Sequence, residues 1–251
     1  VFSTHNVNLV YTYLPTSADK TYFLPPTLTN GNVHGIIVLN VYNERLLRLL
    51  AETQIPKVFL DTSSLVAPDE LNGDLLLMES RTSVRRITSH LLEQGRTLPG
   101  FIGDIGYAQS NRERYEGFCQ ALTDAGKKVD SSLCLTTPLG IDTYREEIDT
   151  FLSSLSRMPD AFVCASDYVA CILMQLLEKR GLRVPEDVAV SGFDNNTEDL
   201  LAEHLTTVQV FNEELGARLA LQILYRIKYP NTPHEITYLG TNVLYRDSTG
   251  D

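Results

Sequence analysis

The stretch GLRVPEDVAVSGFDN, residues 181–195, decides the fold. Its first residue, Gly181, follows an amphipathic helical pattern and can supply the left-handed stop at which many helices end. The run Val188–Phe193 is short and mostly apolar, as is typical of a strand buried on both faces of a parallel sheet. Asp194 comes next, so we expect a carboxylate at the carboxyl end of a strand, where open α/β sheets bind ligands. An ordinary Asx turn over 194–196 is the alternative interpretation.

The same unit of strand, polar loop, amphipathic helix and glycine recurs along the 251 residues. Five further strands are predicted: Val33–Leu39, Val58–Asp61, Leu75–Met78, Gly100–Asp104 and Ala161–Ala165. They are continuously apolar and alternate with helices, which predicts a doubly wound α/β fold with parallel sheets. The length suffices for one large domain or for two lobes of about 125 residues each.

Four stripes with a period near 3.6 residues predict helices between the strands. The stripes are Val84, Ile87 and Leu91; Tyr115, Phe118, Cys119 and Leu122; Ala170, Leu173, Met174 and Leu177; and Leu215, Leu219, Ile223 and Ile227. Gly95 and Gly126 are predicted helix ends, like Gly181. Ser110 followed by Glu113 indicates a capping box at a helix start.

The opening VFSTHNVNLVYTYL, residues 1–14, has the pattern of a helix end, a turn and then a strand. A doubly wound unit should begin with a strand before that helix, so we expect the first strand of the fold to be missing from this chain. Residues 14–32 are rich in Pro, Thr and Asn and are expected to form a loop with at most a short helix.

Composition narrows the class of protein. Hydrophobic residues make up 43% and charged residues 21%, which is ordinary for a soluble domain. No apolar run approaches the roughly 20 residues needed to cross a bilayer. The formal net charge of −11 makes this piece a poor binder of phosphate backbones. The four cysteines form no C-x-x-C pair and are predicted to be free thiols in a reducing compartment, although an even count permits two disulfides.

The motifs of catalysis are missing from the sequence. There is no phosphate-binding G-x-x-x-x-G-K-[ST], no dinucleotide-binding G-x-G-x-x-G and no G-x-S-x-G nucleophile elbow. The five histidines are scattered, with no H-E-x-x-H pair for zinc. We therefore predict no catalytic residue, no metal and no cofactor, and a binding protein is favoured over an enzyme.

Polar residues follow the predicted strands at their carboxyl ends. Arg114 is about one turn inside the helix after one strand, Ser166 and Asp167 follow another, and Glu79 and Thr82 follow a third. Taken singly, each has a structural alternative as a helix cap, a surface ion pair or an exposed loop acid. Together with Asp194 they fit a sugar, whose hydroxyls need carboxylate acceptors, an Arg donor and short polar groups.

At these residues the sequence resembles the effector-binding domain of the LacI/GalR family of bacterial transcription regulators. The resemblance covers nearly the whole chain, in the order of the family's motifs. It rests on VHGIIVL (33–39), IPKVFLD (55–61), SHLLEQG (89–95), SNRERYEGFCQALTDAG (110–126), PDAFVCASDYVA (159–170), GLRVPEDVAVSGFDN (181–195), LTTVQVFNEELG (205–216) and YRDST (245–249).

The resemblance implies a periplasmic-binding-protein-like fold of type I, with two α/β lobes, three crossing segments and the effector in the cleft. It places the amino-terminal lobe at residues 1–104 and 210–238, and the carboxyl-terminal lobe at 105–209 and 239–251. It also assigns roles to side chains: Arg114 would grip polar groups of the effector and Asp194 would accept from a hydroxyl. The effector-binding residues that it implies are Arg114, Asp194, Ser166, Glu79, Thr82, Asp167, Val210 and Asn212.

The function implied is the sensing and dimerisation domain of a cytoplasmic repressor. A small sugar or sugar derivative would control operator DNA binding by an N-terminal helix-turn-helix that this chain lacks, in a homodimer without a membrane contact. The alternative is a periplasmic sugar-binding receptor of a transport system; the GFDN and YRDST segments and the unpaired cysteines argue against it. Ser166 and Glu79 stand where many members have Asn and Asp, which leaves the identity of the effector open.

Overall fold

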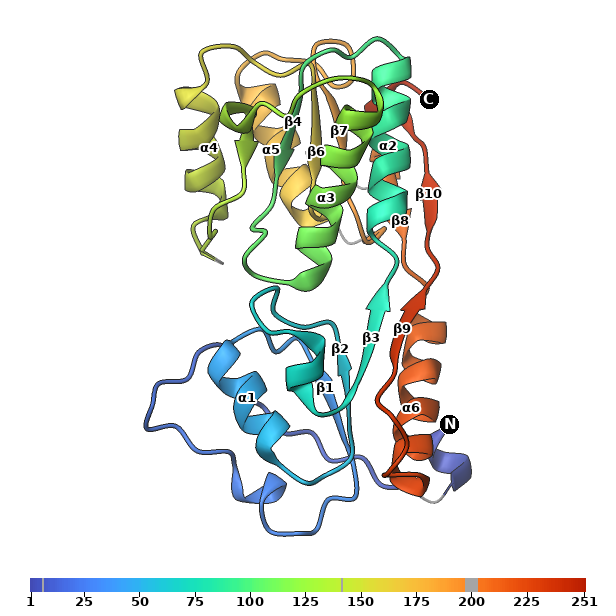
Figure 1. The fold of residues 1–251 in the computed structure, drawn as a ribbon. Coiled ribbons are helices and arrows are strands. Elements are labelled where there is room, and N and C mark those ends of the chain that lie inside the picture. Colours follow the sequence, from blue (N-terminus) through green and yellow to red (C-terminus); the bar gives the residue numbers. More distant parts are fainter. Residues whose placement is uncertain (6, 141, 197–202) are drawn as a thin grey trace. The chain divides into compact units, whose positions relative to one another are not determined.

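The computed structural model describes residues 1–5, 7–140, 142–196 and 203–251, and it divides into two compact units (Figure 1). The first unit comprises Val1–Met78, Ala108–Ser110 and Phe211–Leu239. The second unit comprises Glu79–Tyr107, Asn111–Val210 and Gly240–Asp251. Each unit has its own four-stranded parallel sheet.

This division differs from the lobe boundary expected at Asp104. Residues 79–104, expected in the amino-terminal lobe, group with the second unit. The physical reason is pairing: β4 (Pro99–Ile102) is a central strand of the second sheet, and α2 (Arg81–Glu93) packs against β6 (Ala161–Cys164) and β10 (Asn242–Leu244).

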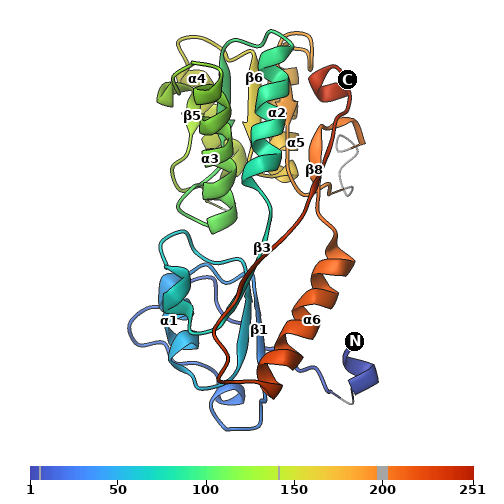
Figure 2. The same cartoon turned by 45° about the vertical axis from the view of Figure 1, so that its right-hand side comes forward.

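The first unit is built on a four-stranded parallel sheet in the order β1-β2-β3-β9. The strands are β1 (Ile36–Leu39), β2 (Lys57–Leu60), β3 (Asp74–Met78) and β9 (Ile236–Leu239). Two helices, α1 (Glu44–Glu52) and α6 (Asn212–Lys228), flank this sheet (Figure 2). Asn43 caps α1 by accepting from the Leu46 N–H, and the core gathers around Leu47, Phe59 and Leu75.

The prediction of a strand near the start of the chain is wrong. Phe2–His5 forms a short 3-10 helix, and no strand follows it in residues 7–14. Leu9, Val10, Tyr11 and Tyr13 are exposed. An apolar alternation becomes a strand only when a neighbouring edge accepts its hydrogen bonds, and none of the described residues offers one here. The loop expected over residues 14–32 is confirmed, with a single short helix at Pro26–Leu28.

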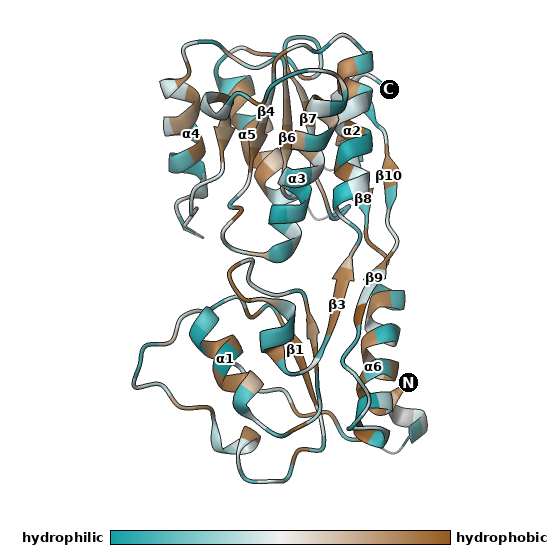
Figure 3. Cartoon of the chain, in the orientation of Figure 1, coloured by the Kyte–Doolittle hydropathy of each residue, from teal (hydrophilic) through white to brown (hydrophobic). Residues whose placement is uncertain are grey.

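The second unit is built on a parallel sheet in the order β5-β4-β6-β7. The chain passes from β4 to β5 on one side of it and then crosses back to β6 and β7 on the other side. The unit is therefore doubly wound, as the sequence predicts. Its central elements are strongly hydrophobic, β6 and α5 most visibly (Figure 3). The bounds are β5 (Cys134–Leu135), β7 (Ala189–Ser191), α3 (Gln109–Asp124), α4 (Tyr144–Ser154) and α5 (Asp167–Lys179).

A two-stranded antiparallel ladder of β8 (Thr207–Gln209) and β10 completes the second unit. The terminal YRDST motif fastens it to β7. The Ser248 hydroxyl donates to Val190 O at 2.6 Å and accepts from the Thr206 N–H at 2.8 Å, while Arg246 Nη1 donates to Leu205 O at 3.0 Å. The closing motif therefore has a structural reason, because it satisfies buried backbone groups at the edge of the sheet.

Most predicted elements form, with ends shifted by a few residues. All six predicted strands are present, and Gly95, Gly126 and Gly181 end their helices with φ of +91°, +70° and +73°. The predicted capping box is wrong: α3 begins at Gln109, and the Ser110 hydroxyl donates instead to Asp61 Oδ2 at 2.6 Å.

Close helix packing explains the glycine of the R-x-x-G-F motif. Helices α2 and α3 approach so closely that a Cβ on Gly117 would overlap the carbonyl oxygen of Arg81. Any larger residue at this position forces the two helices apart. The four cysteines form no disulfide bond, and Cys164 and Cys171 are buried. Within the described residues no helix has both the length and the apolar composition for a membrane span.

Candidate functional site

Arg114, on the second turn of α3, is the central cation at the carboxyl ends of β6 and β7. Only 4% of the residue is exposed. One Nη donates to Ala165 O, directly after β6, and the guanidinium lies 3.7 Å from the centre of the Phe193 ring, after β7. Among the described residues Nε has no acceptor. A buried guanidinium with a free donor is costly unless a further group completes it.

Asp194 is the carboxylate next to that cation. Its Oδ1 lies 3.5 Å from Arg114 Nη2, and 43% of its side chain is exposed. Its backbone is fixed by donation to Val208 O at 3.0 Å, with φ of +112°. The partly desolvated surroundings raise the pKa of Asp194, and the Arg114 charge opposes the shift. The carboxylate is thus oriented by the backbone and retains lone pairs for a ligand hydroxyl.

Asp167 is a second carboxylate in the same place, and it is buried. Its oxygens accept from the Thr207 hydroxyl at 2.5 Å and from the Asn196 N–H at 2.7 Å. Burial raises its pKa to about 6, and the neighbouring charge of Asp194 adds to the shift. Two carboxylates close together in a low-dielectric site are typical of a functional site rather than of a stabilising core.

The glycine of the G-F-D motif makes room for Asp167. A Cβ on Gly192 would overlap Asp167 Oδ1 and come within 2.9 Å of Leu205 Cδ2. The backbone of Asp167 is also fixed here, because its N–H donates to Phe193 O at 2.8 Å. The motif GFD therefore positions two carboxylates, its own and that of the following helix.

Ser166 and Asn195 have structural roles. The Ser166 hydroxyl accepts from the Val169 N–H at 3.3 Å, which confirms the helix-cap alternative for this residue. Asn195 donates to Gln209 Oε1 at 2.6 Å and accepts from Arg246 Nη2 at 2.8 Å. It therefore locks the turn after β7 through both ends of its side-chain amide.

Glu79 and Thr82 lie at the start of α2. The Glu79 carboxylate accepts from the Thr82 N–H at 2.5 Å and from both the N–H and the hydroxyl of Ser83 at 3.1 Å. Thr241 donates its hydroxyl to Glu79 O at 2.8 Å. Glu79 is therefore a capping carboxylate for α2, which is compatible with the helix dipole. No hydrogen bond joins it to Arg114 or Asp194 within the described part of the chain.

The last two predicted residues lie on either side of the boundary between the units. Val210 ends the second unit and is buried, whereas Asn212 is the exposed first residue of α6 in the first unit. Of the eight predicted residues, the structure thus brings Arg114, Asp194, Ser166 and Asp167 together at one end of the second sheet.

Sequence reasoning missed three residues that build this site. Phe193 carries the ring under Arg114, Thr207 holds Asp167, and Gln209 holds the turn through Asn195. Phe193 looks like ordinary core, and its role depends on contact with a residue 79 positions earlier in the chain. The two threonines of the LTT run, residues 205–207, were the signal in the sequence that could have identified Thr207 as a polar residue of the site. No cluster of metal-ligating side chains occurs among the described residues.

We expect Asp167 to make stability depend on pH between about 4 and 6. Its folded pKa of about 6 lies above the usual 3.8, so the folded state binds the proton more tightly. The stabilising effect is complete below pH 4 and is lost as pH rises through 6, about 3 kcal/mol in all. Asp167→Asn should remove this slope from urea unfolding curves.

The exposed Asp187 supplies the control for this pH dependence. Its pairing with Arg183 lowers its pKa to about 2, outside the measured window, so Asp187→Asn should keep the wild-type slope between pH 4 and 7. A slope that is equal in the wild type and in Asp167→Asn contradicts the assignment.

Comparisons with known proteins agree with this fold. Residues 88–249 match the family described as periplasmic binding protein-like domain. The HTH-type transcriptional repressor PurR of Glaesserella parasuis is 27% identical over 206 residues, 81% of this chain and 59% of that protein. The HTH-type transcriptional regulator DegA of Bacillus subtilis is 31% identical over 170 residues, 67% of this chain and 48% of that protein. The chain therefore spans about half of the length of these relatives.

A solved structure gives the same result. The complex of the transcriptional regulator CelR with cellobiose superimposes with a TM-score of 0.78 at 27% identity, over 88% of this chain and 68% of that one. The chain therefore belongs to the family of periplasmic binding protein-like domains, in the form found as the effector-binding domain of LacI-type transcriptional regulators.

Proposed function

We propose that the Arg114–Asp194 pair holds a carbohydrate effector at the carboxyl end of the second sheet. The observation that carries this proposal is the Arg114 side chain, which is almost fully buried yet keeps Nε without an acceptor in the described part of the chain. A ligand oxygen would complete it, while Asp194 accepts from an adjacent hydroxyl. The Phe193 ring below the guanidinium holds it in this orientation.

The chemistry of the site favours a polyol over an anion. The Asp194 carboxylate, 3.5 Å from Arg114, already offsets the charge of that guanidinium, and the charge of Arg246 acts on the Asp167 carboxylate in the same way. The site therefore has no uncompensated cation to attract a phosphate or carboxylate ligand. Neutral hydroxyls can both donate to carboxylates and accept from Arg114. The bound cellobiose of the CelR structure supports the same class of ligand.

The whole protein, in this proposal, is a cytoplasmic homodimeric repressor. PurR and DegA are named as HTH-type regulators, and this chain spans only part of their length, which supports a DNA-binding helix-turn-helix outside these residues. A chain with a net charge of −11 would leave DNA contact to such a basic segment. The effector acts by binding one conformation of the domain more tightly than another and so shifting the population.

The rival function is a periplasmic sugar receptor of a transport system. PurR and DegA are transcriptional regulators, which favours the regulator. We propose no catalytic activity, because the site offers neither a nucleophile with an adjacent base nor a metal cluster within the described residues.

A thermal-shift screen of the purified chain tests the proposal. The panel holds pentoses, hexoses and disaccharides, cellobiose included, with nucleobases and amino acids as other ligand classes. A ligand at 100 times its Kd stabilises by about 2.7 kcal/mol, which raises the unfolding temperature by several degrees. We expect at least one carbohydrate to do so. Stabilisation by another class alone, or by nothing in the panel, contradicts the proposal.

A further inference from the structure

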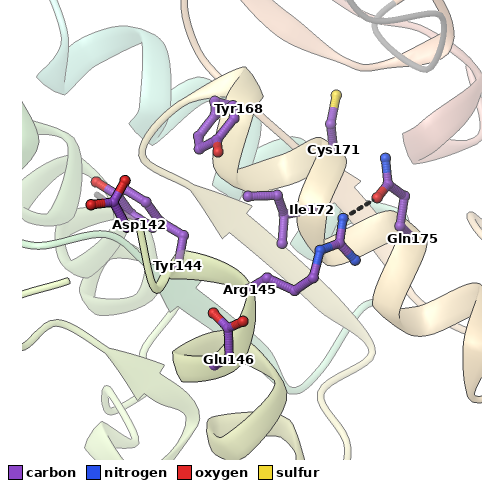
Figure 4. A pocket seen from close by; sticks show the side chains of 8 residues that line it. All are labelled: Asp142, Tyr144, Arg145, Glu146, Tyr168, Cys171, Ile172 and Gln175. Carbon is purple, nitrogen blue, oxygen red and sulfur yellow. Dashed lines mark hydrogen bonds between the residues drawn. The ribbon is translucent and has the colours of Figure 1, made fainter. Parts of the chain in front are cut away.

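A cavity in the second unit is lined by none of the residues proposed above to bind the effector (Figure 4). Its volume is about 360 Å³, within the range of roughly 300–1,000 Å³ that small-molecule sites occupy. It is formed by the first turn of α4 and one face of α5. The lining residues are Asp142, Tyr144, Arg145, Glu146, Tyr168, Cys171, Ile172 and Gln175.

The cavity has an aromatic wall. The rings of Tyr144 and Tyr168 meet edge to face, with centroids 5.7 Å apart and an interplanar angle of 84°. Tyr168 is 60% exposed although it is a large apolar ring, so it covers no core. In an edge-to-face pair, one of the two rings turns its edge toward the other ring. The face of that first ring therefore stays available to the apolar C–H side of a sugar ring.

The rest of the lining is polar and charged. Arg145 donates an Nη to Gln175 Oε1, which fixes both side chains on one side of the cavity. Asp142 and Glu146 supply carboxylates, and Ile172 supplies an apolar floor. One aromatic face with hydroxyl acceptors and donors around it is the arrangement that a carbohydrate requires.

The position of the cavity connects it to the proposed site. Asp167 and Tyr168 are the first two residues of α5, which begins just beyond the carboxyl end of β6. Burial raises the pKa of Tyr144, and the charges of Tyr107 and Asp104, beyond the end of β4, add to that shift. The tyrosine wall therefore lies at the same end of the second sheet as Asp167.

We infer that this cavity is a second sugar-ring subsite, which makes the effector a disaccharide or longer oligosaccharide rather than a single sugar. The inference rests on the proposed function, because the first ring occupies the Arg114–Asp194 site. The second ring stacks on Tyr168 and places its hydroxyls against Asp142, Arg145 and Glu146. The subsite distinguishes disaccharides from monosaccharides, whereas the Arg114–Asp194 site distinguishes carbohydrates from other classes of ligand.

Calorimetric titration with matched sugars tests the subsite. The probes are glucose against cellobiose and maltose, and galactose against lactose. In the wild type the best disaccharide should bind at least tenfold more tightly than its monosaccharide. Tyr168→Ala should weaken that disaccharide about tenfold and its monosaccharide less than twofold. Tyr168→Phe keeps the ring and should restore most of the affinity.

Tyr229→Ala is the matched control, because Tyr229 is an exposed tyrosine of the first unit and should leave both affinities unchanged. Disaccharides that bind no more tightly than monosaccharides, or a Tyr168→Ala variant that loses equal factors for both, overturn the subsite and leave the proposed function intact. Binding of no sugar by the wild type overturns both proposals.

Discussion

Replacing Arg114 by methionine is expected to weaken carbohydrate binding about 100-fold. Methionine keeps the volume of the stem but removes every donor that a ligand oxygen could meet. A hydrogen bond to a charged group contributes about 1.5–3 kcal/mol, and each 1.4 kcal/mol is a factor of ten in affinity. The variant also loses the contact with Phe193 and the attraction to Asp194. Calorimetric titration with the best sugar of the screen measures the effect.

The matched control for the lost charge is Arg85→Met. Arg85 is an exposed arginine of α2, paired at 2.7 Å with Asp124, so its loss changes the net charge equally but touches no part of the site. Its affinity should equal that of the wild type. The Arg114 variant should unfold within about 1 kcal/mol of the wild type, because removing a buried charge offsets the lost contacts. Full affinity in a folded Arg114→Met variant would falsify the assignment.

The second large effect concerns stability, and it lies in the first unit. Arg226 and Asp74 form an ion pair at 2.5 Å with both side chains 2% exposed. Arg226 also donates to Thr232 O and Pro233 O, and Asp74 accepts from Gln222 at 2.7 Å. Arg226→Met leaves the Asp74 carboxylate buried without its cation. We expect a loss of about 3–5 kcal/mol in urea unfolding.

Two further variants separate the pair from its surroundings. Asp74→Leu combined with Arg226→Met removes both charges, so the double variant should lose less free energy than the sum of the single losses. Arg48→Met is the exposed control, because Arg48 pairs with Glu70 at 3.0 Å with about half of each side chain in solvent. It should cost less than 1 kcal/mol. Additive losses at positions 74 and 226 contradict a coupled pair.

The positions of the main strands along the chain could be predicted because parallel strands are buried on both faces. Phe59 in β2 and Phe162 in β6 have no exposed surface, and such strands show as continuous apolar runs. The short edge strands lack that signal: β5 has two residues, and in β9 only every second residue is partly buried. In residues 7–14 the apolar pattern of a strand is present, but no strand forms. Such a pattern cannot say whether a neighbouring strand edge exists to pair with it.

The site was predictable to the extent that strand ends define it. Arg114 and Asp194 follow recognisable strands, so their meeting at one sheet edge follows from the parallel order. The carboxylate of Glu79 follows a strand as well, but its oxygens cap α2. The sequence is equally consistent with both outcomes because a carboxylate three residues before a helical N–H is suited to either role. Only the hydrogen-bond geometry separates them.

The most direct test of the central claim is a crystal structure of this chain with the sugar that stabilises it most in the screen. The predicted result places one sugar ring with an oxygen within about 3.2 Å of the Arg114 guanidinium and a hydroxyl within the same distance of the Asp194 carboxylate. A well-ordered sugar that contacts neither residue would contradict the account, whatever its affinity.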